Sequence, residues 1–290
     1  MAEVPHRAGL VAILGRPNAG KSTFVNRVLG QKLAIVTAKP QTTRSRILGI
    51  FTTENAQLLL LDTPGMHAGT RPLNAAMNEM VQKAAADCDV ALVLVDPSGG
   101  WGDDHRALCA ELDRRRRPLR VVETKGDRAH SLAESWPAGG PPLRRISART
   151  GEGVEALIVE VASLLPESPQ LYPADQISDR PLRFLAGELV REAAFEALSQ
   201  ELPYALAVEV EEFDEKRGDL VRIRANLLVE RASQKQIAIG RGGAVIKRIG
   251  VQARREIEAL LDTRVHLELW VKIDPRWARR PKRLKSLGYS

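Results

Sequence analysis

Short apolar runs alternate with stretches of helical spacing over the first 165 residues of the chain. That order brings successive strands into one parallel sheet, because each helix crosses over to cover a face of it. We therefore predict a doubly wound α/β domain. Its predicted strands are Val11–Leu14, Ile47–Thr52, Leu58–Leu61, Val90–Val95, Leu119–Val122 and Leu143–Ile146, and its clearest helices are Thr23–Leu29 and Val154–Leu165.

One pair of apolar runs departs from this order. Ile47–Thr52 is followed so closely by Gln57–Leu61 that no crossover helix fits between them. Parallel neighbours need a connection of about a dozen residues or more, whereas antiparallel neighbours need only a tight turn. The spacing predicts an antiparallel hairpin within an otherwise parallel sheet.

A proline-rich stretch at 166–181 separates this pattern from a second one. It contains four prolines and no sustained periodicity, as expected of a linker. The remainder predicts an α+β domain, whose elements are a helix Leu182–Ser199, strands Tyr204–Phe213 and Leu220–Val229, helices Gln234–Ile239 and Ala244–Leu261, and a strand Val265–Ile273. We expect domains at 1–166 and 182–275, the linker at 167–181 and a basic tail at 276–290.

Charge is distributed unevenly between these regions. The 290-residue chain carries a net charge of +7, yet the segment from Arg231 onward has 15 basic and 5 acidic residues, a net of +10 that leaves −3 for the rest. A cationic patch at one end of a chain is typical of proteins that bind a phosphate polymer or an anionic membrane surface. The C-terminal domain is therefore the one expected to bind such a partner.

Cysteine usage and hydropathy indicate the compartment. Cys88 and Cys109 are isolated and fit neither a metal-binding spacing nor a disulfide framework. No apolar run approaches the roughly 18 to 20 residues that a membrane helix needs. We expect reduced thiols and a cytoplasmic protein.

The most specific motif lies between the first predicted strand and the first predicted helix. Residues 15–22 match GxxxxGK[ST], a loop whose backbone N–H groups and helix N-terminus surround nucleotide phosphates. Lys21 is expected to reach the β- and γ-phosphates, and the Ser22 hydroxyl to bind Mg²⁺. The predicted phosphate contacts are Gly15, Arg16, Pro17, Asn18, Ala19, Gly20, Lys21, Ser22 and Thr23.

A second motif, Asp62-Thr63-Pro64-Gly65, follows the predicted strand Leu58–Leu61. The Asp62 carboxylate at this place is expected to hold the Mg²⁺ shell through water, and the Gly65 N–H to contact the γ-phosphate. Thr63 and Pro64 are included among the predicted nucleotide contacts.

Two further motifs follow the last strands of the sheet. Thr124-Lys125-Gly126-Asp127 and Ser147-Ala148-Arg149 resemble the guanine-recognition motifs of GTPases, usually NKxD and SA[KR]. Asp127 would accept hydrogen bonds from the guanine N1–H and exocyclic amine, which adenine cannot offer. Thr124 replaces the usual Asn and can form fewer bonds, so we expect weaker nucleotide binding with the guanine preference retained.

A polar, aperiodic segment at 37–44 has the character of a switch loop. One of its threonines, Thr43 in preference to Thr42, is expected to complete the Mg²⁺ shell when a γ-phosphate is present. Met66 follows Gly65 where many GTPases have a water-orienting glutamine. Because a thioether cannot orient water, we expect slow intrinsic hydrolysis, with Asn18, Lys21, Thr43 and Gly65 as the catalytic residues.

A glycine loop lies inside the basic segment, between the helices predicted at Gln234–Ile239 and Ala244–Leu261. A GxxG loop beside an apolar groove is how KH domains hold about four single-stranded nucleotides. The predicted RNA contacts are Gly240, Arg241, Gly242, Gly243, Lys247 and Arg248. In the tail, Trp277 among Arg and Lys residues favours base stacking with phosphate contact over a membrane-surface segment.

Taken together, these motifs resemble those of the Era family of bacterial GTPases over nearly the whole chain. The shared features are the loop at 15–22, Gln41-Thr42-Thr43-Arg44, the motif at 62–65, the proline-rich linker, Leu202-Pro203-Tyr204 and the segment 265–272. The resemblance implies a GTPase domain joined to a type II KH domain that binds the 3′ end of small-subunit ribosomal RNA and assists maturation of the 30S subunit. It also implies a monomeric cytoplasmic protein with some peripheral contact to an anionic membrane.

Within such loops, Asn18 resembles the ligand that holds a potassium ion beside the β- and γ-phosphates, where a cation could stabilise charge during hydrolysis. The expected cofactors are GTP or GDP, Mg²⁺ and K⁺. An alternative is an RNA-binding assembly scaffold that uses bound nucleotide structurally and turns over negligibly. A tRNA-modification GTPase is disfavoured, because those proteins place other domains around the nucleotide module.

Overall fold

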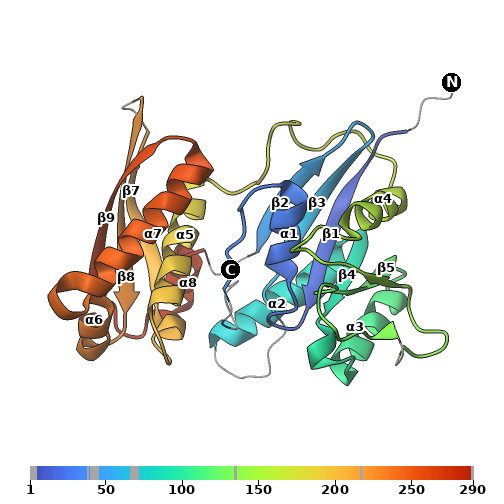
Figure 1. The fold of residues 1–290 in the computed structure, drawn as a ribbon, viewed down its shortest axis with the longest axis horizontal. Coiled ribbons are helices and arrows are strands. Elements are labelled where there is room, and N and C mark those ends of the chain that lie inside the picture. The colour runs from blue at the N-terminus through green and yellow to red at the C-terminus, as the bar shows by residue number, and fades with distance from the viewer. Residues whose placement is uncertain are drawn as a thin grey trace. The chain divides into compact units, whose positions relative to one another are not determined.

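The computed structural model describes residues 5–37, 39, 46–65, 72–133, 136–215 and 218–288. These residues form two compact units (Figure 1). The first lies within residues 1–179, and the second comprises residues 180–288 with the short stretches 35–37, 39 and 72–73. Each unit has its own core.

The first unit is built on a six-stranded sheet in the order β2-β3-β1-β4-β5-β6. Its strands are β1 (Arg7–Gly15), β2 (Ile47–Thr52), β3 (Ala56–Asp62), β4 (Val90–Val95), β5 (Leu119–Glu123) and β6 (Leu143–Arg145). The pairs involving β1, β4, β5 and β6 are parallel, and β2 pairs antiparallel with β3. The predicted hairpin is therefore confirmed.

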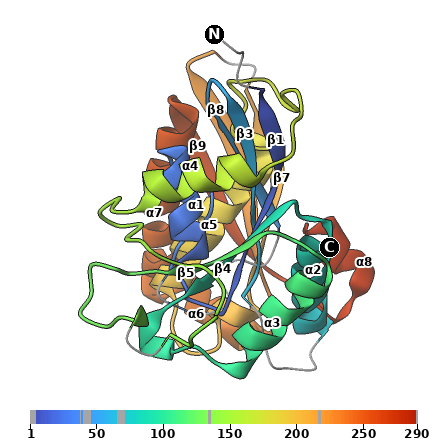
Figure 2. The same cartoon turned by 90° about the vertical axis from the view of Figure 1, so that its right-hand side faces the viewer.

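Helices cover both faces of this sheet, as Figure 2 shows. Helices α1 (Lys21–Leu29) and α4 (Val154–Leu164) share one core with the sheet, through residues such as Phe24 and Leu157. Helices α2 (Pro72–Asp87) and α3 (Asp103–Arg114) share the other, through Val81 and Leu108. The doubly wound α/β class with one antiparallel strand is confirmed. A 3₁₀ turn, η1 (Pro97–Gly99), follows β4.

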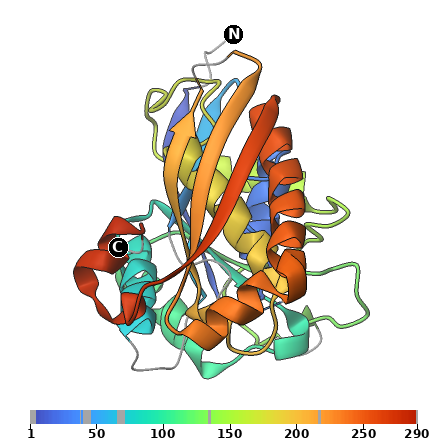
Figure 3. The same cartoon turned by 90° about the vertical axis from the view of Figure 1, so that its left-hand side faces the viewer.

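The second unit packs helices against a three-stranded sheet in the order β7-β8-β9. Its elements are α5 (Leu182–Ala197), β7 (Ala207–Asp214), β8 (Leu220–Val229), α6 (Ala232–Ile239), α7 (Ala244–Leu261) and β9 (Arg264–Ile273). Strand β8 pairs antiparallel with β7 and parallel with β9. Figure 3 shows α5 behind the strands, and the α+β class is confirmed.

The prediction that a strand begins at Tyr204 is wrong. Residues Pro203–Ala205 form a 3₁₀ turn, η3, and β7 begins at Ala207. Proline at the start of this turn has a fixed φ and no N–H to donate to a strand ladder.

The tail is part of the second unit's fold. It forms a 3₁₀ turn, η5 (Trp277–Arg279), and a short helix, α8 (Pro281–Ser286). Trp277 is fully buried, and its indole N–H donates to the Ala205 carbonyl at 3.1 Å. A buried indole cannot stack on a nucleic-acid base, so the stacking role predicted for Trp277 is wrong.

Candidate functional site

The glycines of the 15–22 loop are required by backbone geometry. Gly15, the last residue of β1, has φ +142°, and a Cβ there would lie 2.3 Å from the Leu94 carbonyl oxygen. Gly20 has φ +91° and is the N-cap of α1. Both values lie in the region that favours glycine, which allows the chain to turn sharply from β1 into the helix.

Lys21 lies inside this turn. Its side chain is buried, and its Nζ donates to the carbonyls of Gly15 at 3.1 Å and Arg16 at 2.8 Å. Burial lowers the pKa of Lys21 to about 8, an effect that the negative charge of Asp62 partly opposes. The ammonium group is therefore held within the loop where the sequence predicts the phosphates.

The two predicted magnesium residues lie next to each other. The Ser22 hydroxyl donates to Asp62 Oδ2 at 2.7 Å. Asp62 is fully buried at the end of β3, where the parallel register aligns it with Ile13 of β1. A hydroxyl and a carboxylate are the oxygen ligands that Mg²⁺ prefers, so these residues fit the ion.

The segment after Asp62 passes directly against the phosphate loop. The Thr63 hydroxyl donates to the Ile13 carbonyl at 2.7 Å, which attaches the segment to β1. A Cβ on Gly65 would lie 2.5 Å from the backbone nitrogen of Pro17. Glycine is therefore needed at 65 for this close approach, and the γ-phosphate contact of its N–H stays a prediction.

Thr124 joins the base-recognition loop to the phosphate loop. It is 2% exposed, and its hydroxyl is 2.8 Å from the Ala19 carbonyl and 3.2 Å from the Val95 carbonyl. A hydroxyl can donate only one proton, and the shorter contact is the one to the phosphate loop. The residue that replaces the usual Asn therefore fastens the two loops together.

Asp127 and Ser147 lie together across the ends of β5 and β6. The Ser147 hydroxyl donates to Asp127 Oδ1 at 2.8 Å, and Arg149 is 3.7 Å from Oδ2. The hydrogen bond from Ser147 lowers the pKa of Asp127. An ionised, oriented carboxylate is what guanine recognition requires. Lys125 has φ +57° and forms an ion pair with Asp96.

The side chains of Arg27 and Arg16 fix loops of this site, and the sequence did not predict these contacts. Arg27 of α1 donates to the carbonyls of Ala148 at 3.0 Å and Arg149 at 2.8 Å, which fixes the loop after β6. Arg16 forms a two-point ion pair with Asp104, with bonds of 2.7 and 2.5 Å. The sequence marks Arg27 only as a basic residue in the last turn of α1. The loop that it contacts lies more than 100 residues further along the chain, so its partners could not be predicted from neighbouring residues.

Thr43 and Met66 lie outside the described residues, whereas Asn18 lies within the phosphate loop. Asn18 has φ +61°, a left-handed conformation that Asn tolerates better than most residues. This conformation is a structural reason for Asn at position 18 besides the predicted potassium contact.

Replacing Thr124 with Val is expected to lower the free energy of unfolding by about 1–3 kcal/mol, because a buried carbonyl loses its donor without a change in side-chain shape. GTP affinity should fall as well, since the two nucleotide loops lose their hydrogen bond. Chemical denaturation and calorimetric titration measure the two effects. Thr124→Ser keeps the hydroxyl and is the control. Equal stability and affinity of the Val variant would contradict the linking role.

In the second unit, the glycine loop joins α6 to α7. Gly240, Gly242 and Gly243 have φ values of +74°, +59° and +79°. A Cβ at Gly240 would meet Val245 at 2.5 Å, whereas nothing lies within 4 Å of one at Gly242 or Gly243. The loop thus leaves open space over its last two glycines, where a ligand backbone could approach.

A groove runs beside this loop between α7 and β9. Its lining combines apolar with basic side chains, namely Ile246, Lys247, Gly250, Val251, Arg254, Leu267 and Leu269. Apolar surface for bases next to cations for phosphates suits single-stranded RNA. Arg241 and Lys247 are exposed, whereas Arg248 donates to the Ala197 carbonyl at 2.7 Å and so also caps α5.

Comparison with known proteins gives two family matches. Residues 10–125 match the family described as 50S ribosome-binding GTPase, and residues 201–278 match the KH domain. "GTPase Era" of Pseudomonas putida strain F1 is 45% identical over 98% of this chain and 97% of its own length. "GTPase Era" of Leuconostoc citreum is 42% identical over 100% and 99%.

Two solved structures cover nearly the full length. Era in complex with MgGDPNP and nucleotides 1506–1542 of 16S ribosomal RNA has a TM-score of 0.92 at 35% identity, covering 98% of this chain and 99% of that one. An Aquifex aeolicus Era variant bound to GDP·AlF4⁻ has a TM-score of 0.91 at 34% identity, with coverages of 98% and 99%. Both domains are therefore matched within single chains.

Proposed function

The chain belongs to the Era family of GTPases, and on this premise we propose that it is a GTP-driven switch that binds the 3′ end of small-subunit ribosomal RNA and assists maturation of the 30S subunit. The observation that carries the proposal is that a phosphate loop tied to a guanine-recognition loop occurs in one chain with a glycine loop beside a basic groove. We propose residues 1–166 as the nucleotide domain and 182–275 as the RNA domain.

In the proposed reaction, water attacks the γ-phosphorus of GTP, the bond to the bridging oxygen breaks, and GDP and inorganic phosphate are released. Lys21 neutralises charge on the β- and γ-phosphates, and Asp127 holds the guanine. Ser22 and Asp62 would hold Mg²⁺, which neutralises phosphate charge. Thr43 is proposed to join them when a γ-phosphate is present.

Coupling between nucleotide and RNA is proposed to pass through the segment that follows α1. Ile35 is part of the second unit's core, and the Val36 N–H donates to Glu192 of α5 at 2.8 Å. This segment leads directly into the predicted switch residues 37–44. Ordering of the switch by GTP would therefore change the conformation of residues directly joined to Ile35 and Val36, which pack against the second unit and α5.

Replacing both Arg241 and Lys247 with Ala is expected to weaken RNA binding without unfolding the protein, because both side chains are exposed. Each lost phosphate contact should flatten the plot of log affinity against log salt by about 0.7 for single-stranded RNA. Fluorescence anisotropy over a salt series measures this slope on an oligonucleotide copying the 3′ end of 16S RNA. An unchanged slope would remove the glycine loop from the RNA site.

The potassium contact of Asn18 is tested through turnover. We expect GTP hydrolysis at matched ionic strength to be faster in K⁺ than in Na⁺, and Asn18→Asp to alter that ratio while keeping a side chain that tolerates positive φ. Equal rates in both salts would eliminate the potassium role. Near-zero turnover in every condition, with GTP still bound, would favour the assembly scaffold over the switch.

Peripheral contact with an anionic membrane and a monomeric state both stay predictions. Over the described residues, no helix is long and apolar enough to cross a membrane. Peripheral contact with an anionic membrane is tested by co-sedimentation with vesicles, and the monomeric state by analytical ultracentrifugation.

A further inference from the structure

The tail 276–288 is a folded platform with its apolar side facing inward. The exposed fractions of Trp277, Leu284 and Leu287 are 0%, 5% and 9%. All three are buried, so the tail cannot offer them to a partner without unfolding. What it presents to solvent is mainly charge.

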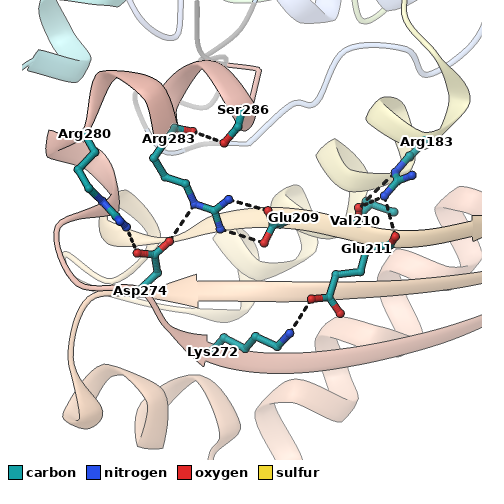
Figure 4. Close-up of polar contacts among 9 residues, drawn as sticks. All are labelled: Arg183, Glu209, Val210, Glu211, Lys272, Asp274, Arg280, Arg283 and Ser286. Carbon is teal, nitrogen blue, oxygen red and sulfur yellow. Dashed lines mark hydrogen bonds and ion pairs between the residues drawn. The ribbon is translucent and has the colours of Figure 1, made fainter.

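Two of the six cations in the tail are used to fix it in place (Figure 4). Arg283 donates to both carboxylate oxygens of Glu209 on β7, at 2.7 and 2.9 Å, and to Asp274 at 2.9 Å. Arg280 forms an ion pair with the other oxygen of Asp274. The hydrogen bonds that Arg283 donates to Glu209 and Asp274 raise its pKa. A bidentate arginine–carboxylate pair requires one specific geometry, so these bonds fix the orientation of α8 relative to β7.

The other four cations face outward. Arg276, Arg279, Lys282 and Lys285 are exposed, and none has an ion-pair or hydrogen-bond partner for its side chain among residues 5–37, 39, 46–65, 72–133, 136–215 and 218–288. We call these four residues the tail cations. No acidic side chain of the described residues pairs with them, so their positive charge can attract an anionic partner.

We propose that the tail cations form a second RNA-binding surface, which contacts backbone phosphates outside the nucleotides held at the glycine loop. This inference rests on the proposed RNA-binding function and adds a site to it. A phosphate polymer supplies the complementary charge and needs no apolar contact. A membrane-surface helix must insert an apolar face into the bilayer, and the apolar face of this tail is already buried.

The tail begins at the same end of the sheet as the helix that leads to the glycine loop. The Asp274 N–H donates to the Val229 carbonyl at 2.8 Å, so the tail leaves β9 at the end of the sheet where β8 also ends. Helix α6 begins at Ala232, just beyond that end of β8, and the glycine loop follows its last residue, Ile239. The tail and α6 therefore start from the same end of the sheet, and the glycine loop is separated from that end by one short helix.

The test compares a tail variant with a matched control on two RNAs. The variant is Arg279→Gln, Lys282→Gln and Lys285→Gln together, which leaves Arg280 and Arg283 in place. The control is Arg114→Gln, Arg116→Gln and Arg128→Gln, which removes the same charge from exposed positions in the first unit. One RNA copies nucleotides 1506–1542 of 16S RNA, and the other is a segment of about four nucleotides that fills only the glycine loop.

We expect the tail variant to bind the long RNA about tenfold or more weakly at about 0.1 M salt, with the salt slope flattened by about 2 for three lost contacts. Its affinity for the short RNA should match that of the unsubstituted protein, and the control should match on both. Undiminished binding of the long RNA would overturn the inference, as would equal weakening on both RNAs or by the control.

Three further outcomes are decisive. Vesicles of phosphatidylcholine and phosphatidylserine that retain the unsubstituted protein but release the tail variant, with RNA affinity unchanged, would assign the tail to lipid and overturn the inference. Failure of the unsubstituted protein to bind either RNA would overturn the proposed function together with this inference. Loss caused by Arg241→Ala and Lys247→Ala but not by the tail variant would overturn the inference alone.

Discussion

Replacing Lys21 with Ala is expected to lower GTP turnover by at least about 10²–10³-fold, the usual effect of removing one preorganised donor from a charged transition state. The reason is its position, because the ammonium group is buried in the loop between Gly15 and Ser22. Single-turnover hydrolysis measures the loss. Arg114→Ala, which removes an exposed cation from α3, is the control, and turnover of the Lys21 variant at the control's rate would contradict the assignment.

Lys21 also predicts a pH dependence of nucleotide binding. Its pKa is lowered to about 8 by burial in the free protein, and phosphate binding favours the charged form. Above pH 8, binding must therefore be accompanied by proton uptake, and GTP affinity should fall by up to about tenfold per pH unit. Below pH 8 this contribution is constant. Titration calorimetry in buffers of different ionisation heat counts the proton, and the Lys21→Ala variant should take up none.

Replacing Asp127 with Asn is expected to lower GTP affinity by at least about 10²-fold and to raise affinity for xanthosine triphosphate. The carboxylate is oriented by Ser147 and ionised, and an amide at that place would face the guanine donors with a donor of its own. Xanthine offers a carbonyl there, which the Asn amide can bind. Competition binding with the two nucleotides and ATP measures the exchange.

Asp127→Ala is the control for this exchange, because it removes the acceptor without supplying a donor. It should weaken GTP binding and bring no gain for the xanthine nucleotide. An unsubstituted protein that binds ATP as well as GTP would show that Asp127 does not select the base.

Local patterns were sufficient for most of the fold. The alternation of apolar runs predicted all six strands of the first sheet and the β2–β3 hairpin, since a connection of a few residues allows only antiparallel pairing. Phosphate-loop chemistry was also local, because the glycines and Lys21 are contiguous in sequence. The start of β7 was mispredicted, because the apolar pattern already begins at Tyr204, inside the turn Pro203–Ala205 that precedes the strand.

The sequence by itself determined the two fold classes, the motif at 15–22, the guanine motifs and the glycine loop, because each depends on residues close together along the chain. Only the tertiary structure decided which distant groups meet. Thr124 reaches the Ala19 carbonyl, Arg27 holds the loop after β6, and Glu209 anchors Arg283. The tail is the clearest case in which a sequence pattern was insufficient. Its aromatic and basic composition suggested base stacking, but whether Trp277 is outside or inside depends on the sheet and turns it packs against, which no pattern within the tail encodes.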